Sequence, residues 1–280
     1  HAVHDLAEAF GGRRADAQVR AVFALQFRVA RLDGVVPLLQ RVVVGVGYLR
    51  LVLAVVKFVV MRDLGGETRE VSLLFADVRG FTRISEGMSA QELIRFLNRL
   101  FTPLSDVILA ERGTIDKFMG DAVMAFWNAP VLDPKHARNA CVAALAMLRE
   151  LERLNSIWAA EAASRGETPQ PVRIGIGINT GDCCVGNAGS PQRFDYSILG
   201  DVVNVASRLE DTTKTYGTPI VVGGRTADCA PEMAMIEIDS VEIRGKQRPE
   251  RVYALLGDET VAASERFRSL KAAHAELIAA

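Results

Sequence analysis

The architecture of this chain is read most directly from VSLLFAD, residues 71–77, an almost continuous apolar run that ends in a carboxylate. Such a run is typical of a strand that is covered on both faces. A carboxylate at the end of a buried strand costs free energy unless it is paired, hydrogen-bonded or bound to a metal. Taken alone, Asp77 is as compatible with a loop cap or turn former as with a chemical site.

The residues after this run favour the chemical site. The segment RGFT, residues 79–82, supplies a flexible glycine, backbone N–H groups and a hydroxyl. Successive backbone N–H groups of this kind form concave sites for anions. We therefore expect a phosphate-bearing ligand next to Asp77.

The elements further along the chain follow from periodicity and capping signals. Ser89 and Glu92 form a capping-box pattern that opens a helix ending near Gly113. A second helix is expected from Asp133-Pro134 to about Arg165, and a third over 201–216. Strands are expected over 114–117, 122–127, 172–179, 183–187, 194–199, 220–222, 235–238 and 251–256. This order predicts an α+β, ferredoxin-like plan, βαββαβ, with additions.

Three segments are expected along the chain. Residues 1–66 form an N-terminal regulatory, linker or membrane-proximal segment, residues 67–257 the catalytic domain, and residues 258–280 a helical tail. The apolar stretch 42–61 contains Arg50 and Lys57, which are costly inside a bilayer. It favours a buried or dimer-forming helix, or a strand, over a membrane span. Because the chain opens with His1, we expect a piece of something longer.

The composition excludes several classes of protein. In a chain of 280 residues, 33 basic and 34 acidic side chains leave a net charge of −1, which argues against a nucleic-acid footprint. The four cysteines show no Cys-x-x-Cys spacing, so neither a disulfide scaffold nor a zinc module is indicated. A reducing, intracellular compartment is expected.

Two further groups of polar residues point to nucleotide chemistry. Asp121 sits in the turn between two expected strands, and together with Asp77 it would suit Mg²⁺, which takes one or two carboxylates plus substrate phosphates. Asn204 and Arg208 are four residues apart and share one helix face. An amide beside a guanidinium suits a sugar or a phosphate that gains negative charge. By contrast, His136 is expected at the surface.

Three segments resemble the signature motifs of class III nucleotidyl cyclases: FADVRGFT (residues 75–82), DKFMGD (116–121) and LGDVVNVASRLE (199–210). They occur in the family's order and at roughly its spacing, within residues 70–257. The resemblance implies a homodimer whose catalytic sites lie at the interface and are each built from both protomers. It also implies conversion of a nucleoside triphosphate to a 3′,5′-cyclic monophosphate and pyrophosphate, a phosphorus–oxygen lyase reaction.

The resemblance also implies a role for each matching residue. Asp77 and Asp121 match the pair that binds two divalent ions, Mg²⁺ or Mn²⁺, with the Val78 carbonyl as a further ligand. One ion promotes loss of the 3′-OH proton and the other holds the triphosphate and the leaving pyrophosphate. Asn204 matches the residue that orients the ribose, and Arg208 the one that stabilises charge on the α-phosphate.

The triphosphate contacts follow in the same way. Phe81 and Thr82 match the loop around the β- and γ-phosphates. The segment 244–246 resembles the family's basic strand end, which makes Lys246 the candidate contact. Arg251 is the competing candidate, because the loop length leaves this match open.

The base that the resemblance implies is adenine. Lys117 meets the family's adenine pattern, and a cation that donates to adenine N1 is chemically sensible. Ser197 stands where Asp or Thr is commoner, and its hydroxyl can both donate and accept, so it discriminates less sharply. Asp195 on the same strand face is an alternative contact. ATP is favoured over GTP.

We therefore interpret the chain as an adenylate cyclase that makes cAMP for intracellular signal transduction. We expect its catalytic domain to be cytoplasmic. Membrane attachment through the N-terminal region or a missing upstream part stays open. An inactive cyclase-like module for dimerisation or nucleotide binding would lack a metal aspartate, the Asn or the Arg, and all four residues are present. A diguanylate cyclase would carry a Gly-Gly-Asp/Glu-Glu-Phe turn, which is absent, and a guanylate cyclase is disfavoured by Lys117.

Overall fold

Residues 65–190, 193–241 and 249–279 are described by a computed structural model of the chain. The chain divides into two units. One comprises residues 67–185 and 197–280; the other comprises residues 1–66 and 186–196. Residues 1–64 of the predicted N-terminal segment, with the apolar stretch 42–61, lie outside the described residues, and the division into segments 1–66, 67–257 and 258–280 stays a prediction.

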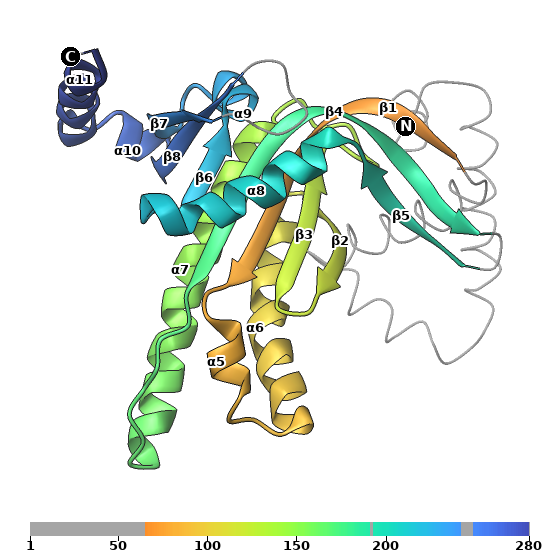
Figure 1. Cartoon of the computed structure of the whole chain (residues 1–280), viewed down its shortest axis with the longest axis vertical. Helices are drawn as coiled ribbons and strands as arrows, with labels where there is room; N and C mark the ends of the chain where they lie inside the picture. The colour runs from red at the N-terminus through yellow and green to blue at the C-terminus, as the bar shows by residue number, and fades with distance from the viewer. Residues whose placement is uncertain (1–64, 191–192, 242–248, 280) are drawn as a thin grey trace, which may run out of the picture. The chain divides into compact units, whose positions relative to one another are not determined.

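The strands of the described residues form one eight-stranded sheet (Figure 1). Its order is β2-β3-β1-β4-β6-β8-β7, and β5 pairs with β4 outside this path. The bounds are β1 Gly65–Val78, β2 Thr114–Met119, β3 Ala122–Trp127, β4 Ile174–Ser190, β5 Arg193–Leu199, β6 Ile220–Gly223, β7 Ala234–Val241 and β8 Glu250–Gly257.

The helices connect these strands and follow the last one. They are α5 Phe81–Ser85, α6 Ala90–Ala110, α7 His136–Ser164, α8 Asp201–Tyr216, α9 Gly224–Cys229, α10 Glu259–Ala262 and α11 Glu265–Ala279. Among the described helices, none is long and apolar enough to cross a membrane.

The first four strands confirm the ferredoxin-like plan. Their spatial order is β4-β1-β3-β2, with α6 between β1 and β2 and α7 between β3 and β4. This is the order of a split βαβ unit. The antiparallel register of β1 and β3 places Asp77 opposite Ala122. It therefore brings the end of β1 next to the turn that precedes β3.

Helices cover both faces of the sheet. On β6, Ile220 and Val222 belong to the main core with buried residues of α6 and α7. Val221 points the other way and packs with Val205 and Leu209 of α8. Because side chains alternate along a strand, α8 lies on the face opposite to α6 and α7, as Figure 1 shows.

The sequence predicted the start of α6 correctly but divided β4 into two strands. The capping box of Ser89 and Glu92 is confirmed at the start of α6. The two strands expected over 172–179 and 183–187 are one continuous strand, β4. Within this strand the buried hydroxyl of Thr180 is hydrogen-bonded to the hydroxyls of Ser72 and Thr226.

The C-terminal tail, predicted as one helix, is two. The Asp258 carboxylate caps α10 by accepting from the backbone N–H groups of Thr260 and Val261. Ser264 then interrupts the helix, and its hydroxyl accepts from the Phe267 N–H at the start of α11. The short helix α9 was not predicted.

Candidate active site

Asp77 and Asp121 meet at the end of the sheet. Asp77 is the penultimate residue of β1, and Asp121 directly precedes β3. The carboxyl groups of the two residues are close neighbours, because the charge and the hydrogen-bonding capacity of Asp121 both raise the pKa of Asp77. The fold therefore brings together two carboxylates that are 44 positions apart in the sequence. Among the described residues, no group of three or more His, Cys, Asp or Glu side chains gathers at one point.

The negative charges of Asp77 and Asp121 repel each other. Burial, the charge of Asp121 and a hydrogen-bonding interaction with it, in that order, raise the pKa of Asp77 to about 6. The charge of Lys214 and the backbone N–H of Val78 act in the opposite direction. Such a pair holds a proton more tightly than a single carboxylate does. A divalent cation relieves the same repulsion, so the donor set fits Mg²⁺ or Mn²⁺.

Arg79 links this strand end to α8. Its Nη1 lies 3.2 Å from Glu210 Oε1, and only 7% of the Glu210 side chain is exposed. Burial raises the pKa of Glu210 to about 7, against the lowering effect of the Arg79 charge. Gly175 makes this approach possible, because a Cβ there would overlap the Arg79 guanidinium.

The loop after β1 turns sharply at Gly80, which has a φ of 66° and precedes α5. This left-handed conformation favours glycine. Phe81 is half-buried against the core, whereas Thr82 is exposed. Both predicted phosphate-loop residues thus lie on the first turn of α5, beside the strand that carries Asp77.

Asn204 and Arg208 lie one turn apart on α8, and both are exposed. The buried residues of α8 include Val205 and Leu209, which face the sheet. The predicted catalytic pair therefore occupies the outer face of the helix. The structure brings these two residues together as their spacing predicts.

A third cluster joins β2 to β5. The Ser197 hydroxyl donates to Asp116 Oδ2 at 2.8 Å. Lys117 Nζ lies 3.8 Å from Asp116 Oδ1. The two predicted base contacts, Lys117 and Ser197, are thus brought to one carboxylate that sequence reasoning missed. The feature of the sequence that could have pointed to Asp116 is an acidic residue directly before Lys117. Asp195, the alternative contact, is exposed and belongs to the other unit.

The two candidates for the triphosphate differ. Lys246 lies outside the described residues. Arg251 on β8 is described, and its Nη2 lies 3.1 Å from both carboxylate oxygens of Asp228. Arg251 is therefore already engaged by an acidic side chain.

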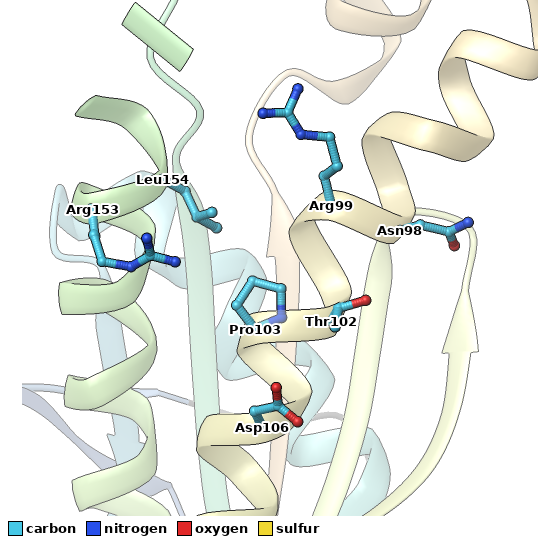
Figure 2. Close-up of a pocket in the computed structure, with 7 residues that line it drawn as sticks. All are labelled: Asn98, Arg99, Thr102, Pro103, Asp106, Arg153 and Leu154. Carbon is cyan, nitrogen blue, oxygen red and sulfur yellow. The ribbon is translucent and has the colours of Figure 1, made fainter. Parts of the chain in front are cut away.

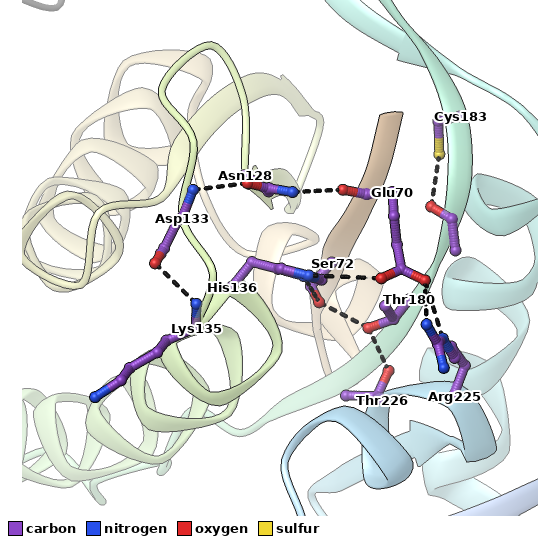
Figure 3. Close-up of polar contacts among 11 residues, drawn as sticks. Glu70, Ser72, Asn128, Asp133, Lys135, His136, Thr180, Cys183, Arg225 and Thr226 are labelled. Atoms are coloured by element: carbon purple, nitrogen blue, oxygen red, sulfur yellow. Dashed lines mark hydrogen bonds and ion pairs between the residues drawn. The ribbon is translucent and has the colours of Figure 1, made fainter. Parts of the chain in front are cut away.

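His136 is buried, so the prediction of a surface position is wrong. Its Nδ1 lies 2.9 Å from the Ser72 hydroxyl and its Nε2 lies 3.9 Å from Glu70 Oε1 (Figure 3). Burial lowers the pKa of His136, although the charge of Glu70 opposes this. Ser72 is fully buried and cannot meet a substrate, so this Ser-His-Glu arrangement connects β1 to α7 and is no nucleophilic site.

One surface cavity of about 430 Å³ lies between α6 and α7 (Figure 2). None of the predicted site residues lines it. Its two arginines are paired with carboxylates, Arg99 with Glu161 and Arg153 with Glu150. The cavity is therefore not the predicted nucleotide site.

Sequence comparison identifies relatives of the larger part of the chain. The sequence model for the family "Adenylate and Guanylate cyclase catalytic domain" matches residues 66–257. Adenylate cyclase 1 of Rhizobium meliloti (strain 1021) is 39% identical over 190 residues, which cover 68% of this chain and 28% of that protein. An adenylate cyclase of Anabaena cylindrica is 36% identical over 191 residues, covering 66% and 36%. The chain thus spans well under half of the length of either relative.

Two solved structures are similar over the same region. The adenylyl cyclase CyaB from P. aeruginosa has a TM-score of 0.62 at 32% identity, covering 70% of this chain and 97% of that one. The guanylyl cyclase Cya2 has a TM-score of 0.62 at 33% identity, covering 70% and 95%. Because one is named for adenylyl and the other for guanylyl chemistry, backbone similarity does not select the base.

Proposed function

The chain belongs to the adenylate and guanylate cyclase catalytic domain family, and we propose that it converts ATP to 3′,5′-cyclic AMP and pyrophosphate. The pairing of Asp77 with Asp121 carries this proposal. Two neighbouring, partly buried carboxylates at a sheet end are costly for stability and useful for holding cations. The resemblance seen in the three sequence motifs is confirmed as membership of this family.

Asp77 and Asp121 would hold the divalent ions, with the Val78 carbonyl beside them. When bound, Mg²⁺ or Mn²⁺ supplies Lewis-acid activation of the ribose 3′-OH and neutralises charge on the triphosphate. Burial and, after it, the charge of Asp121 raise the pKa of Asp77, and a divalent cation at these carboxylates would offset both effects, which supports this use.

The other site residues position the substrate. Asn204 orients the ribose so that the 3′-oxygen faces the α-phosphorus, and Arg208 stabilises the negative charge that develops on the α-phosphate. The 3′-oxygen forms the new bond to phosphorus, its proton leaves to solvent, and pyrophosphate departs. No side chain of the protein has to act as the base.

The geometry of α8 supports a site shared between two protomers. Successive residues of a helix are about 100° apart, so Arg208 points roughly 200° away from Glu210. Glu210 faces Arg79, and the charge of Asp77 contributes to the raised pKa of Glu210. Arg208 therefore points away from the Asp77 cluster of its own chain, and a second copy of α8 would complete the site in a homodimer.

The triphosphate would lie along the loop after β1. Phe81 and Thr82 begin α5 there. Lys246 is the preferred cationic contact, because Arg251 is engaged by Asp228.

The base would be read by Lys117 and Ser197, which share Asp116. Lys117 donates to adenine N1 and Ser197 contacts the neighbouring amino group. GTP is the second candidate substrate, because the guanylyl cyclase Cya2 is as similar in backbone as the adenylyl cyclase CyaB.

We also propose that the catalytic domain works in the cytoplasm, in signal transduction. The described cysteines, Cys141, Cys183, Cys184 and Cys229, are all free, as a reducing compartment favours. Membrane attachment through residues 1–66 or an upstream part stays a prediction.

The test is turnover by the purified chain. Incubation with ATP or GTP, and with Mg²⁺ or Mn²⁺, is expected to yield cyclic AMP from ATP. Asp77→Ala should abolish the product, whereas Asp106→Ala, which removes an exposed carboxylate on α6, should not. Cyclic GMP as the main product would point to the guanylate cyclase reaction. No product from a protein shown to be dimeric would favour an inactive regulatory module.

A further inference from the structure

The Asp116 carboxylate lies between the two side chains that would read the base. One oxygen, Oδ2, accepts from the Ser197 hydroxyl at 2.8 Å, and the other, Oδ1, lies 3.8 Å from Lys117 Nζ. The Asp116 side chain is 0% exposed, whereas 46% of the Lys117 side chain is exposed. Asp116 therefore cannot reach a nucleotide itself, but it lies beside the exposed Lys117 and beside Ser197, which is 6% exposed.

A β-bulge makes this arrangement possible. In the pairing of β2 with β3, Ile115 lies opposite Ala125 and Lys117 lies opposite Met124, so Asp116 is an extra residue without a cross-strand position. In a regular strand Asp116 and Lys117 would point to opposite faces. A bulge removes this strict alternation and is frequent next to active sites, where it redirects a side chain.

We propose that Asp116 is a positioning residue that makes Ser197 an acceptor and thereby selects adenine over guanine; this inference rests on the proposed function. A serine hydroxyl has one proton and two lone pairs. The hydrogen bond to Asp116 uses the proton, so Ser197 presents only lone pairs to the substrate. Adenine carries an amino donor at N6, and guanine carries a carbonyl acceptor at O6.

Lys117 discriminates in the same way at N1, the ring position next to the 6-substituent of the base. The ammonium group is only a donor. It matches the unprotonated N1 of adenine and opposes the N1–H of guanine. A donor at Lys117 and an acceptor at Ser197 thus complement adenine at two adjacent positions and oppose guanine at both. Asp116 converts the ambivalent hydroxyl of Ser197 into the second of these discriminating groups.

The test is the ratio of kcat/KM for ATP to that for GTP, measured with the full chain. Asp116→Ala frees the Ser197 hydroxyl to donate to guanine O6, so the ratio is expected to fall about tenfold, the worth of one hydrogen bond. Asp116→Asn keeps an acceptor oxygen and should give an intermediate ratio. In a Ser197→Ala background, Asp116→Ala should change the ratio by less than about twofold, because the hydroxyl it acts through is gone.

Thr114→Val is the matched control, since it removes the hydrogen bond to the Ala129 carbonyl from the same strand. It should leave the ratio unchanged. A folded, active Asp116→Ala variant with the parental ratio overturns the inference, as does an equal fall in the Ser197→Ala background. A purely structural role of Asp116 would lower turnover of both nucleotides equally.

Binding separates this inference from the proposed function. If the parent chain forms no cyclic nucleotide, the proposed function fails, and the ratio of Kd values for ATP and GTP, obtained by competition with a ribose-labelled fluorescent ATP, replaces the turnover ratio. A fall of that ratio in Asp116→Ala supports the inference and an unchanged ratio overturns it. A parent chain that binds neither nucleotide overturns both.

Discussion

Arg79 and Glu210 form a buried ion pair, with Arg79 Nη1 3.2 Å from Glu210 Oε1 and the side chains 20% and 7% exposed. The pair joins the end of β1, which carries Asp77, to α8, which carries Asn204 and Arg208. It is therefore a direct side-chain link, within one chain, between the strand of the candidate metal ligand Asp77 and the helix of the predicted catalytic pair.

Loss of this link should destabilise the fold. Arg79→Ala leaves a buried carboxylate without its cation, and the free energy of unfolding is expected to fall by about 3 kcal/mol. The matched control is Arg99→Ala, which breaks an exposed pair with Glu161 and should cost less than about 1 kcal/mol. Urea unfolding monitored by circular dichroism measures both. Equal losses in the two variants would contradict the structural importance of the buried pair.

The contributions of Asp77 and Glu210 to the stability of the metal-free chain should fall as the pH rises. The folded-state pKa of Asp77 is raised from 3.8 to about 6 and that of Glu210 from 4.5 to about 7. Between these values the folded chain holds protons that the unfolded chain has released, so the free energy of unfolding decreases with pH. The contribution of Glu210 is present below pH 4.5 and is lost through about pH 7.

Glu210→Gln isolates that contribution. Urea unfolding in the presence of a chelator, at about pH 5 and about pH 7.5, should show a smaller difference in stability for Glu210→Gln than for the parent. An identical difference in the two proteins would mean that Glu210 does not bind a proton on folding.

Asp121→Asn should improve stability and remove metal binding. The change takes away the carboxylate charge that opposes Asp77, so the metal-free variant is expected to be about 1 kcal/mol more stable than the parent. The parent should show a rise in Tm with increasing Mn²⁺, because an ion that binds only the folded state stabilises it. The variant should lose this rise, whereas Asp106→Asn should keep it. A variant that is both less stable and still stabilised by Mn²⁺ would refute the metal assignment.

Two inactive variants should restore activity when they are mixed. If each site takes Asp77 from one protomer and Arg208 from the other, a heterodimer of Asp77→Ala with Arg208→Ala retains one intact site. Random exchange of subunits gives about half heterodimers with one of two sites intact, hence about a quarter of the parental activity. Cyclic AMP formation after subunit exchange measures this. Activity no higher than that of the separate variants would place both residues of a site on one chain.

Much of the local structure could be predicted because its causes are local. The capping box at Ser89 depends on residues three positions apart, and it is present at the start of α6. The shared face of Asn204 and Arg208 depends only on helical spacing, and both are exposed on α8. The ferredoxin-like plan, βαββαβ, was predicted from the order of the elements, and the strand order β4-β1-β3-β2 confirms it.

Other features could not be predicted, since they depend on distant contacts. His136 was expected at the surface because its neighbours in sequence are polar, yet Ser72, 64 positions away, accommodates it in the interior. The buried hydroxyl of Thr180, in the middle of β4, likewise finds its partners far away in the sequence, in Ser72 and Thr226.

The sequence by itself determined the type of chemistry, through the carboxylates Asp77 and Asp121, the polar pair on α8 and the cation Lys117, each within a short motif. Only the tertiary structure decided which of these groups share a partner. Ser197 donates to Asp116 across 81 positions, and Arg79 meets Glu210 across 131. Periodicity and capping act over a few residues, whereas such contacts depend on strand order, register and the bulge in β2.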